Sequence, residues 1–448
     1  MRAGERFSED MRQGVHIAMG GFALALPLIP WWQSVVLASL AVVLNIFALQ
    51  KLLGVRLYRP GERLRRLTSG IVLYPLAIVG LLLVFSARVD IVAAAWGILA
   101  AGDGMATIVG RRWPIAAIPW NRRKSVGGSL ALAVFGGAAG AGLAWWCRET
   151  VVPPAYAWYP LAAFAAAAVA AAVETIPISL DDNVSVTASA AAVLWALSLV
   201  STDLAVAAVQ SRAWILPLAL SANIIVAAAG YRAGTVTIPG AIAGAGLGTV
   251  ILVCTGLAGW TLLLVSFACA VVTSRLGLAR KQALGIAEER GGRRGAGNAF
   301  ANTGVAGVAA VMSVVTYAHG TGRLAFVAAL VAGASDTVAS EIGKAWGRRT
   351  FLVTTGRGVP PGTSGAMSVE GTLAGIASAT LLSAGAAALA LTSWPLVPAV
   401  VAAATAGALV ESLMGATLEP RGVVNNDVLN FLNTSVAALA AVELSRLI

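Results

Sequence analysis

The feature that most constrains the fold is a succession of apolar stretches separated by short polar segments. Hydrophobic residues make up 58% of the chain and charged residues only 11%, whereas soluble domains carry about 25% charged residues. A helix needs about 20 apolar residues to cross a bilayer. The sequence therefore predicts an all-α, polytopic membrane helical bundle with about 15 transmembrane helices. The expected spans are 15–31, 33–50, 68–86, 90–110, 126–146, 157–178, 184–202, 213–230, 237–254, 256–274, 299–318, 323–343, 367–391, 393–416 and 427–447.

Basic residues are concentrated between the expected spans and give a net charge of +11. The basic segments at 51–66, 111–124, 275–294 and 344–357 all follow even-numbered spans and therefore lie on one side, which an excess of Lys and Arg marks as cytoplasmic. We expect an integral protein of the plasma (inner) membrane of a prokaryote, with its N-terminus and its sites on the cytoplasmic side. Because the charges belong to the membrane topology, no nucleic acid is expected as a partner. The oligomeric state stays open.

Two polar motifs each occur twice within the apolar sequence. Residues 103–110 and 336–343 read D-x-x-A-[ST]-x-x-G, and residues 125–131 and 368–374 read S-V-x-G-[ST]-L-A. In both halves a lone glutamate on an apolar stretch and then an acid–amide segment follow. This repeated order predicts two tandem repeats, which are parallel because an even number of spans separates them.

The repeat predicts three regions along the chain. Residues 1–208 form a first membrane domain, residues 209–234 a connecting helix, and residues 235–448 a second membrane domain. Each membrane domain is expected to carry one site.

An ionisable residue inside a membrane is costly, so the two motif aspartates are candidate functional residues. Residues four apart share a face of a helix, which aligns Asp103 with Thr107 and Asp336 with Ser340. A carboxylate beside a hydroxyl can hold a hydrated Mg²⁺ together with phosphate oxygens. The alternative is an aspartate that bonds a neighbouring helix and serves packing alone.

The second motif opens an apolar stretch directly after a basic segment. The free N–H groups of a helix start, with a glycine and a hydroxyl, can bind phosphate. The alternative is that Ser129 and Thr372 only cap or pack their helices. Glu174 and Glu411 can serve as a base or as a second metal ligand. For His16, at the start of the first span, a capping or interfacial role is a sufficient explanation.

These residues favour one reaction class. The chain has neither a zinc-ligand pattern nor a motif for an acyl-transfer nucleophile. Mg²⁺-dependent phosphoryl or nucleotidyl transfer needs mainly positioning and charge neutralisation. The acceptor would be a lipid that is reached from within the bilayer.

The two halves carry motifs of two known families. The first half contains Gly102–Ala106, Gly110–Arg112, Lys124–Ser129, and Glu174 with Asp181–Asn183. This set resembles the CTP-dependent polyprenol kinase family, which includes dolichol kinase and phytol kinase. The second half contains Leu284–Asn298, Ala334–Gly343, Pro361–Gly365 and Glu411–Glu419. This denser set is similar to the DUF92/TMEM19 family, which contains plant phytyl-phosphate kinase.

The resemblance implies two consecutive reactions on one chain. The domain at 1–208 would be a polyprenol (phytol) kinase, and the domain at 235–448 would be phytyl-phosphate kinase-like and make the diphosphate. The implied cofactor is Mg²⁺, and the implied phosphoryl donor is CTP or another nucleoside triphosphate. The expected partners are an isoprenoid alcohol, a prenyl phosphate, the nucleotide and the lipid bilayer.

Roles follow for individual residues. Catalytic roles are expected for Asp103, Glu174, Asp336 and Glu411. Metal ligation is expected from Asp103, Thr107, Asp336 and Glu341. Nucleotide or phosphate binding is expected from Gly110, Arg111, Lys124, Gly128, Ser129, Asp182, Asn183, Arg293, Arg294, Asn298, Ser340, Gly343, Thr363, Gly371, Thr372, Asn426, Asp427 and Asn430.

Two other functions remain open at this point. A CDP-lipid synthase-like cytidylyltransferase would use the same donor groups and release pyrophosphate. A membrane transporter would explain duplicated halves and polar residues in spans, but transporter sites lie near the midplane of the bilayer.

Overall fold

The computed structural model describes residues 8–47, 70–148, 159–287 and 292–448. In these residues the chain is mostly helical, which confirms the expected helical class. The chain divides into two compact units, Met1–Leu199 and Val200–Ile448, called unit 1 and unit 2 below. The expected connecting helix lies within unit 2. The basic segment expected at 51–66 lies outside the described residues.

Helices that can cross a membrane occur in both units. Within the described ranges, nine helices are long and apolar enough to cross a membrane. Three shorter apolar helices accompany them, namely α2 (Trp31–Phe47), α4 (Gly70–Val84) and α9 (Tyr159–Glu174). These helices support a polytopic membrane protein, and the number of about 15 spans stays a prediction.

Helix α13 (Ile238–Arg275) covers the stretch where the sequence predicts two spans. Its backbone leaves the helical conformation at Gly256, where φ is 69° and ψ is −166°, a conformation that glycine adopts without a steric penalty. Gly248 and Trp260, on either side of Gly256, both contact Asn223. The helix therefore consists of two segments that meet close to the predicted boundary.

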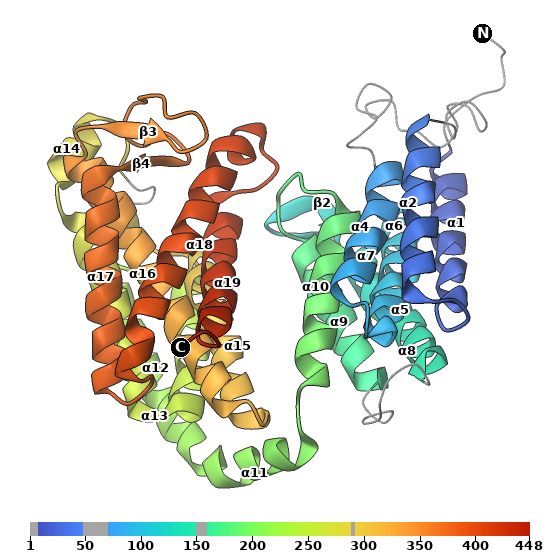
Figure 1. Ribbon diagram of the computed structural model, residues 1–448, viewed down its shortest axis with the longest axis horizontal. Coiled ribbons are helices and arrows are strands. Elements are labelled where there is room, and N and C mark those ends of the chain that lie inside the picture. Colours follow the sequence, from blue (N-terminus) through green and yellow to red (C-terminus); the bar gives the residue numbers. More distant parts are fainter. Residues whose placement is uncertain (1–7, 48–69, 149–158, 288–291) are drawn as a thin grey trace. The chain divides into compact units, whose positions relative to one another are not determined.

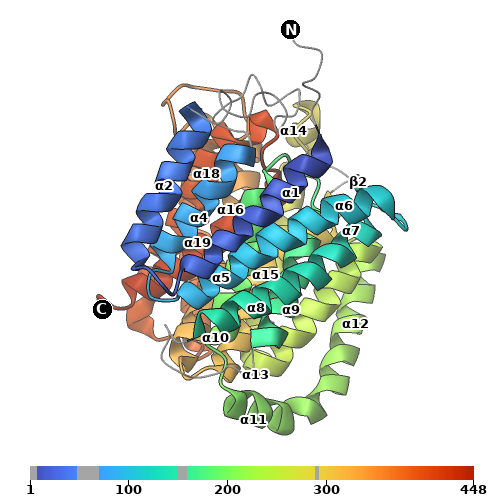
Figure 2. The ribbon, with the colours of Figure 1, turned by 90° about the vertical axis from the view of Figure 1, so that its right-hand side faces the viewer.

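Unit 1 packs its helices around small side chains. Ala166, Ala167 and Ala170 of α9 are fully buried in a core with Ile98 and Leu99, and small residues let membrane helices approach closely. Figure 2 shows α2 and α4 side by side and α1 next to α6. The elements of unit 1, besides α2, α4 and α9, are α1 (Glu9–Met19), η1 (Gly20–Ala25), α5 (Val89–Gly97), α6 (Gly104–Arg112), α7 (Val126–Ala131), α8 (Gly137–Trp146) and α10 (Asp182–Ser198).

Two π-helical turns interrupt the helices that carry the first pair of motifs. Turn η3 (Ile98–Asp103) joins α5 to α6, and turn η4 (Leu132–Gly136) joins α7 to α8. The two turns pack against each other. Because π turns are rare and frequent at functional sites, the position of Asp103 as the last residue of η3 marks this place in the fold.

Helix α16 (His319–Trp346) is the central helix of unit 2. It packs against α13, α15, α17, α18 and α19, and Phe326–Ala332 is a buried run within it (Figure 1). The elements of unit 2, besides α13 and α16, are α11 (Thr202–Arg212), η7 (Ala213–Ile215), α12 (Leu216–Arg232), α14 (Leu278–Ala283), α15 (Ala296–Val315), α17 (Val369–Ala388), η9 (Trp394–Leu396), α18 (Val397–Thr417), η10 (Glu419–Arg421) and α19 (Asn426–Leu444).

A short β-hairpin follows the aspartate motif in each unit. Strand β1 (Ala117–Ile118) pairs antiparallel with β2 (Asn121–Ser125), and β3 (Thr350–Leu352) pairs antiparallel with β4 (Ala366–Ser368). These strands depart from the purely α-helical prediction. In both units the second strand runs directly into the helix of the second motif, α7 or α17.

Candidate functional site

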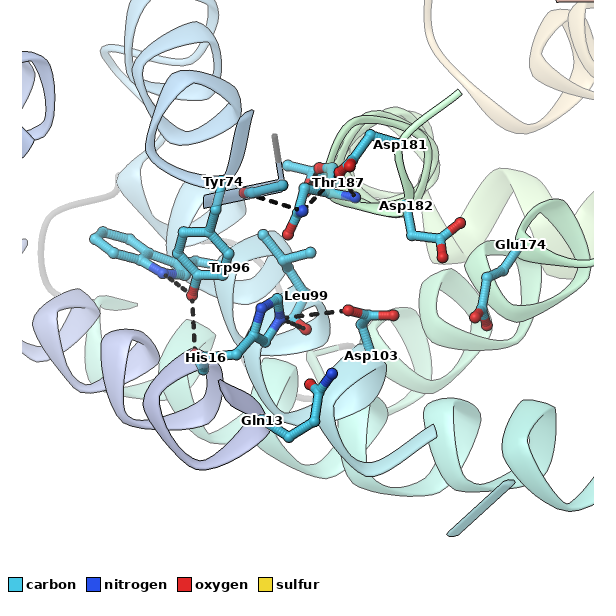
Figure 3. Close-up of polar contacts among 12 residues, drawn as sticks. Gln13, His16, Tyr74, Trp96, Leu99, Asp103, Glu174, Asp181, Asp182 and Thr187 are labelled. Atoms are coloured by element: carbon cyan, nitrogen blue, oxygen red, sulfur yellow. Dashed lines mark hydrogen bonds and ion pairs between the residues drawn. The ribbon is translucent and has the colours of Figure 1, made fainter. Parts of the chain in front are cut away.

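Three carboxylates of unit 1 meet at one place. Asp103 ends η3, Glu174 ends α9 and Asp182 begins α10. One carboxylate oxygen of each residue lies within 4.8 Å of the others, and Figure 3 shows the three side chains pointing toward one another. Glu174 is buried, with 7% of its surface exposed. In the part of the chain that the structure describes, this is the one group of three or more metal-ligand side chains.

Lys124 supplies the positive charge of this cluster. Its Nζ donates to Oδ2 of Asp182 at 2.9 Å and also to Oε1 of Glu174. Burial lowers the pKa of Lys124, but the negative charges of Glu174 and Asp182 outweigh burial and raise the pKa above its usual value. The lysine therefore stays charged at neutral pH.

His16 lies on the other side of Asp103. Its Nε2 is 3.5 Å from Oδ2 of Asp103 and 3.1 Å from the carbonyl oxygen of Leu99. A carbonyl only accepts hydrogen bonds, so Nε2 carries the proton. The ring of Tyr74 meets the imidazole edge-on at a centroid distance of 4.7 Å, and Nε1 of Trp96 donates to the Tyr74 hydroxyl at 2.8 Å. His16 is thus a neighbour of the site, which its position in the sequence does not reveal.

The side-chain amide of Gln13 is buried close to His16 and Asp103 (Figure 3). Its Nε2 donates to Glu9 at 2.9 Å, whereas its Oε1 has no hydrogen-bond partner among the described residues. A buried acceptor without a partner is costly, and a ligand at this place would remove that cost.

The three residues of the acid–amide segment after Glu174, Asp181–Asn183, make different contacts. Asp181 caps α10 by accepting from the backbone N–H of Asn183 at 3.0 Å, and burial raises the pKa of Asp181. The Asn183 amide donates to Asp181 at 2.6 Å and to the carbonyl oxygen of Gly70 at 3.3 Å. Asn183 therefore joins α10 to α4, and Asp182 alone of the segment enters the cluster.

The glycines of the unit 1 motifs form a helix contact. A Cβ on Gly110 would lie 3.1 Å from Oγ of Ser125 and 3.4 Å from Cα of Gly128. Ser125 caps α7 by accepting from the N–H of Gly128 at 3.1 Å. Ser129 lies one turn further along and is half-buried. The capping that the sequence leaves open for Ser129 is carried out by Ser125.

Unit 2 repeats this contact with the equivalent residues. A Cβ on Gly343 would lie 2.9 Å from Oγ of Ser368 and 3.8 Å from Cα of Gly371. Ser368 accepts from the N–H of Gly371 at 3.0 Å, while Thr372 is half-buried in the first turn of α17. The two aspartate motifs therefore sit in the same local architecture.

Unit 2 has a pair of carboxylates where unit 1 has its cluster of three. The side chains of Asp336 on α16 and Glu411 on α18 are in contact, and Lys344 is the positive charge that acts on Asp336. Oε2 of Glu411 is buried and has no hydrogen-bond partner among the described residues. Asn433 of α19 lies against the same carboxylate.

Glu341, which the sequence assigns to metal ligation, lies in a buried ion network instead. Lys281 donates to its Oε2 at 2.6 Å and Lys344 to its Oε1 at 2.8 Å. Lys281 and Glu341 are each 1% exposed, and Lys281 also donates to the carbonyl oxygen of Ser274 at 2.7 Å. Both oxygens of Glu341 are therefore engaged, and its role is to hold Lys344. The buried Lys281 gives no signal in the sequence, because it stands in a basic segment.

The other expected residues are more scattered. Arg111 pairs with Asp10 at the surface at 3.3 Å. Asp427 lies against Gly297 near the start of α15, where Arg294 and Asn298 line a cavity. Like Arg111, four other members of the expected set are exposed, namely Arg293, Ser340, Thr363 and Asn426. Thr107 is half-buried one turn beyond Asp103, and Asn430 is buried on α19.

The second half of the chain matches a known protein family. The model of the family described as integral membrane protein DUF92 matches residues 221–438. An uncharacterized membrane protein of Synechocystis sp. is 36% identical over 203 residues, which cover 44% of this chain and 77% of that protein. No solved structure matches the chain significantly.

Two plant proteins are also similar to the chain. Protein VTE6, chloroplastic, of Arabidopsis thaliana is 35% identical over 209 residues, covering 45% of this chain and 63% of that protein. Farnesol kinase, chloroplastic, of the same plant is 32% identical over 195 residues, covering 40% of this chain and 63% of that protein. The chain thus spans less than two thirds of these two relatives. Together with the family match and the apolar helices, the similarities show that the chain belongs to the DUF92 family of integral membrane proteins.

Proposed function

We propose that the chain is an integral membrane kinase of isoprenoid alcohols. Unit 1 makes a prenyl monophosphate of the phytyl or geranylgeranyl type, and unit 2 converts it to the diphosphate. The observation that carries this proposal is the cluster of Asp103, buried Glu174 and Asp182 with Lys124. The similarity to proteins named farnesol kinase and phytol kinase supports it.

The donor set of unit 1 fits Mg²⁺. This ion prefers carboxylate oxygens, and it is bound in phosphoryl-transfer enzymes by one or two carboxylates together with substrate phosphates. Asp103 and Glu174, with Asp182 and the nearby hydroxyl of Thr107, would hold it. When bound, Mg²⁺ neutralises charge on the transferred phosphoryl group. The unpaired Oε1 of Gln13 is an additional acceptor beside this place.

The residues of unit 1 divide the remaining work of the first reaction. The hydroxyl oxygen of the alcohol attacks the terminal phosphorus of CTP or another nucleoside triphosphate, and the bond from that phosphorus to the bridging oxygen breaks. The nucleoside diphosphate leaves, and the hydroxyl proton goes to a carboxylate of the cluster that does not bind the metal. Lys124 binds the phosphates, and His16 fixes the carboxylate of Asp103.

Unit 2 supports the same chemistry on a phosphate acceptor. An oxygen of the prenyl monophosphate attacks the terminal phosphorus of a second nucleoside triphosphate, and the nucleoside diphosphate leaves as in the first reaction. Asp336 and Glu411 fit Mg²⁺ because they are adjacent carboxylates and Oε2 of Glu411 lacks a partner. Lys344, held by Glu341, supplies the positive charge that Lys124 supplies in unit 1.

The arrangement in the membrane is part of the proposal. The two units are tandem repeats of parallel orientation, and both sites face the cytoplasm at the plasma membrane of a prokaryote. The equivalent contacts of Gly110 with Gly128 and of Gly343 with Gly371 support the repeat. Both sites then draw on one nucleotide pool, while the lipid stays in the bilayer.

Product analysis tests this function. Purified protein in lipid nanodiscs receives geranylgeraniol or phytol, Mg²⁺ and CTP that is labelled at either the γ- or the α-phosphate. We expect γ-label in a lipid monophosphate and then in a diphosphate, and no α-label in lipid. Label from the α-phosphate would identify a cytidylyltransferase. No label in lipid from any prenol or nucleoside triphosphate would overturn the kinase assignment.

A further inference from the structure

Unit 2 contains a cavity whose apolar part none of the roles above uses. Helices α12, α13, α15 and α16 enclose it, and both segments of α13 contribute to its wall. Most of the lining residues are apolar, such as Leu247, Leu263 and Phe267, or are glycines, such as Gly244. A cavity of this character between membrane helices suits a long hydrocarbon chain.

Polar groups occur at one end of this cavity. Arg294 and Asn298 line it where α15 begins. Asn302, one turn deeper on α15, donates its Nδ2 to the carbonyl oxygen of Asn298 at 3.1 Å. Its Oδ1 is buried without a hydrogen-bond partner among the described residues. One cation and two amides at this end of a mainly apolar cavity, whose other polar lining residues are Asn223, Ser266 and Thr303, fit an amphiphile with an anionic head.

The polar end lies next to the proposed site of unit 2. A Cβ on Gly333 would lie 3.1 Å from the Oδ1 atom of Asn302, so the two helices touch at this level. Asp336 is one turn further along α16 and Asn298 one turn back along α15. Helix α15 begins at the polar end of the cavity and α16 ends there. One turn back along α15 and one turn forward along α16 therefore both lead toward that end, each by about 5.4 Å. Asn298 and Asp336 therefore lie at similar depth.

We propose that this cavity binds the isoprenoid chain of a prenyl monophosphate and holds its phosphate at Arg294 and Asn298, beside Asp336. This inference rests on the function proposed for unit 2. The depth of the apolar part makes the site selective for long chains, because each buried methylene adds to the binding free energy.

Two glycines of α13 offer a matched test. Gly244 lines the cavity, Gly246 does not, and a Cβ on either meets no atom within 4 Å. Gly244→Leu adds a side chain at the wall of the cavity, where its Cβ meets no atom, and Gly246→Leu adds the same side chain elsewhere on the same helix. Binding of geranylgeranyl phosphate and of dimethylallyl phosphate to the full-length variants in nanodiscs is measured, together with diphosphate formation from each.

We expect Gly244→Leu to weaken binding of geranylgeranyl phosphate about 15- to 50-fold, as the loss of two or three buried methylenes would. Binding of the short dimethylallyl phosphate and all values for Gly246→Leu should stay within twofold of the wild type. Equal effects of the two variants, or equal effects on both chain lengths, would overturn the cavity assignment. Chain-length-selective binding that Gly244→Leu removes, without any diphosphate formed, would leave the cavity in place and refute the kinase function of unit 2.

Discussion

Nε2 of His16 lies 3.5 Å from Oδ2 of Asp103, so the first helix of the chain contacts the carboxylate at the end of η3. Since Nε2 also meets the carbonyl oxygen of Leu99 at 3.1 Å, the imidazole ties Asp103 to the turn that precedes it. The histidine acts through Asp103 and is a positioning residue.

The first prediction concerns this contact. His16→Ala should lower kcat of monophosphate formation about 10- to 100-fold, because a group that orients an essential partner typically contributes that much. His16→Gln retains an N–H donor and should recover part of the loss. The measurement is the initial rate with geranylgeraniol and labelled CTP. Equal rates for the alanine and glutamine variants would contradict a positioning role.

The second prediction separates the two reactions. Asp103→Asn keeps the shape of the side chain but removes its charge, and it should reduce monophosphate formation at least 100-fold while supplied monophosphate is still converted. Asp336→Asn should have the opposite pattern, because charge stabilisation at each site is lost locally. Lipid products are quantified by mass spectrometry with either substrate. The exposed Asp203→Asn is the control. Loss of both steps in one variant would show that the units do not act separately.

The third prediction concerns metal removal. Chelation of Mg²⁺ should stop both reactions, and Mg²⁺ added back should restore them, because carboxylate clusters of this kind hold a hard cation. Glu174→Gln should raise the Mg²⁺ concentration needed for half-maximal monophosphate formation several-fold. The same variant should leave the Mg²⁺ dependence of diphosphate formation unchanged. A Mg²⁺ requirement that is identical in wild type and variant would remove Glu174 from the metal site.

The fourth prediction concerns the stability of the Lys124 cluster. Lys124→Met leaves Glu174 with a buried uncompensated charge and should lower the free energy of unfolding by about 1–3 kcal/mol, less than for a fully buried pair, because Lys124 and Asp182 are partly exposed. The raised pKa of Lys124 sets the pH window. A raised folded-state pKa means that the contribution is complete below the unfolded value near 10.4 and is lost as the pH rises above it.

The melting temperature in detergent tests this sign. The difference between wild type and Lys124→Met should shrink as the pH rises above the unfolded value near 10.4. The double variant Lys124→Met with Glu174→Gln should recover stability without recovering activity. A difference that disappears already near pH 8 would contradict the raised pKa.

The fifth prediction concerns the ion network of unit 2. Lys281→Met should cost about 3–5 kcal/mol of stability, because Lys281 and Glu341 are both fully buried. Glu341→Gln frees Lys344, so it should slow diphosphate formation and leave monophosphate formation intact. Rates with each substrate, normalised to folded protein, decide this. An unchanged second reaction in Glu341→Gln would show that Lys344 needs no support.

Much of the fold could be predicted because membrane insertion imposes a simple pattern on the sequence. Apolar runs predict the helical segment Val89–Arg112, helix α16 and the interruption of α13 near residue 255, where Gly256 breaks the helix. The strands of the β-hairpins have two to five residues, too few to show a period in the sequence, so they could not be predicted. The π turn at Ile98–Asp103 likewise depends on packing between helices.

The candidate site likewise could be predicted only in part. The proximity of Asp103, Glu174 and Asp182 follows from the repeated motif order, and the structure brings these three together. The engagement of Glu341 by Lys281 could not be foreseen, because the partners are 60 residues apart and lysines in basic segments resemble one another. A capping role suffices to explain His16 in the sequence, and only the folded chain places it beside Asp103.

The two sites differ in the element that carries their lysine. Lys124 stands on strand β2 of a hairpin, whereas Lys344 stands on the same helix as Asp336 and is fixed by Glu341. Lys124 thus reaches its carboxylates from outside the helices that carry them, so a change in the hairpin alone would alter the charge of the first cluster. The charge beside Asp336 is tied to the helix that carries Asp336 itself.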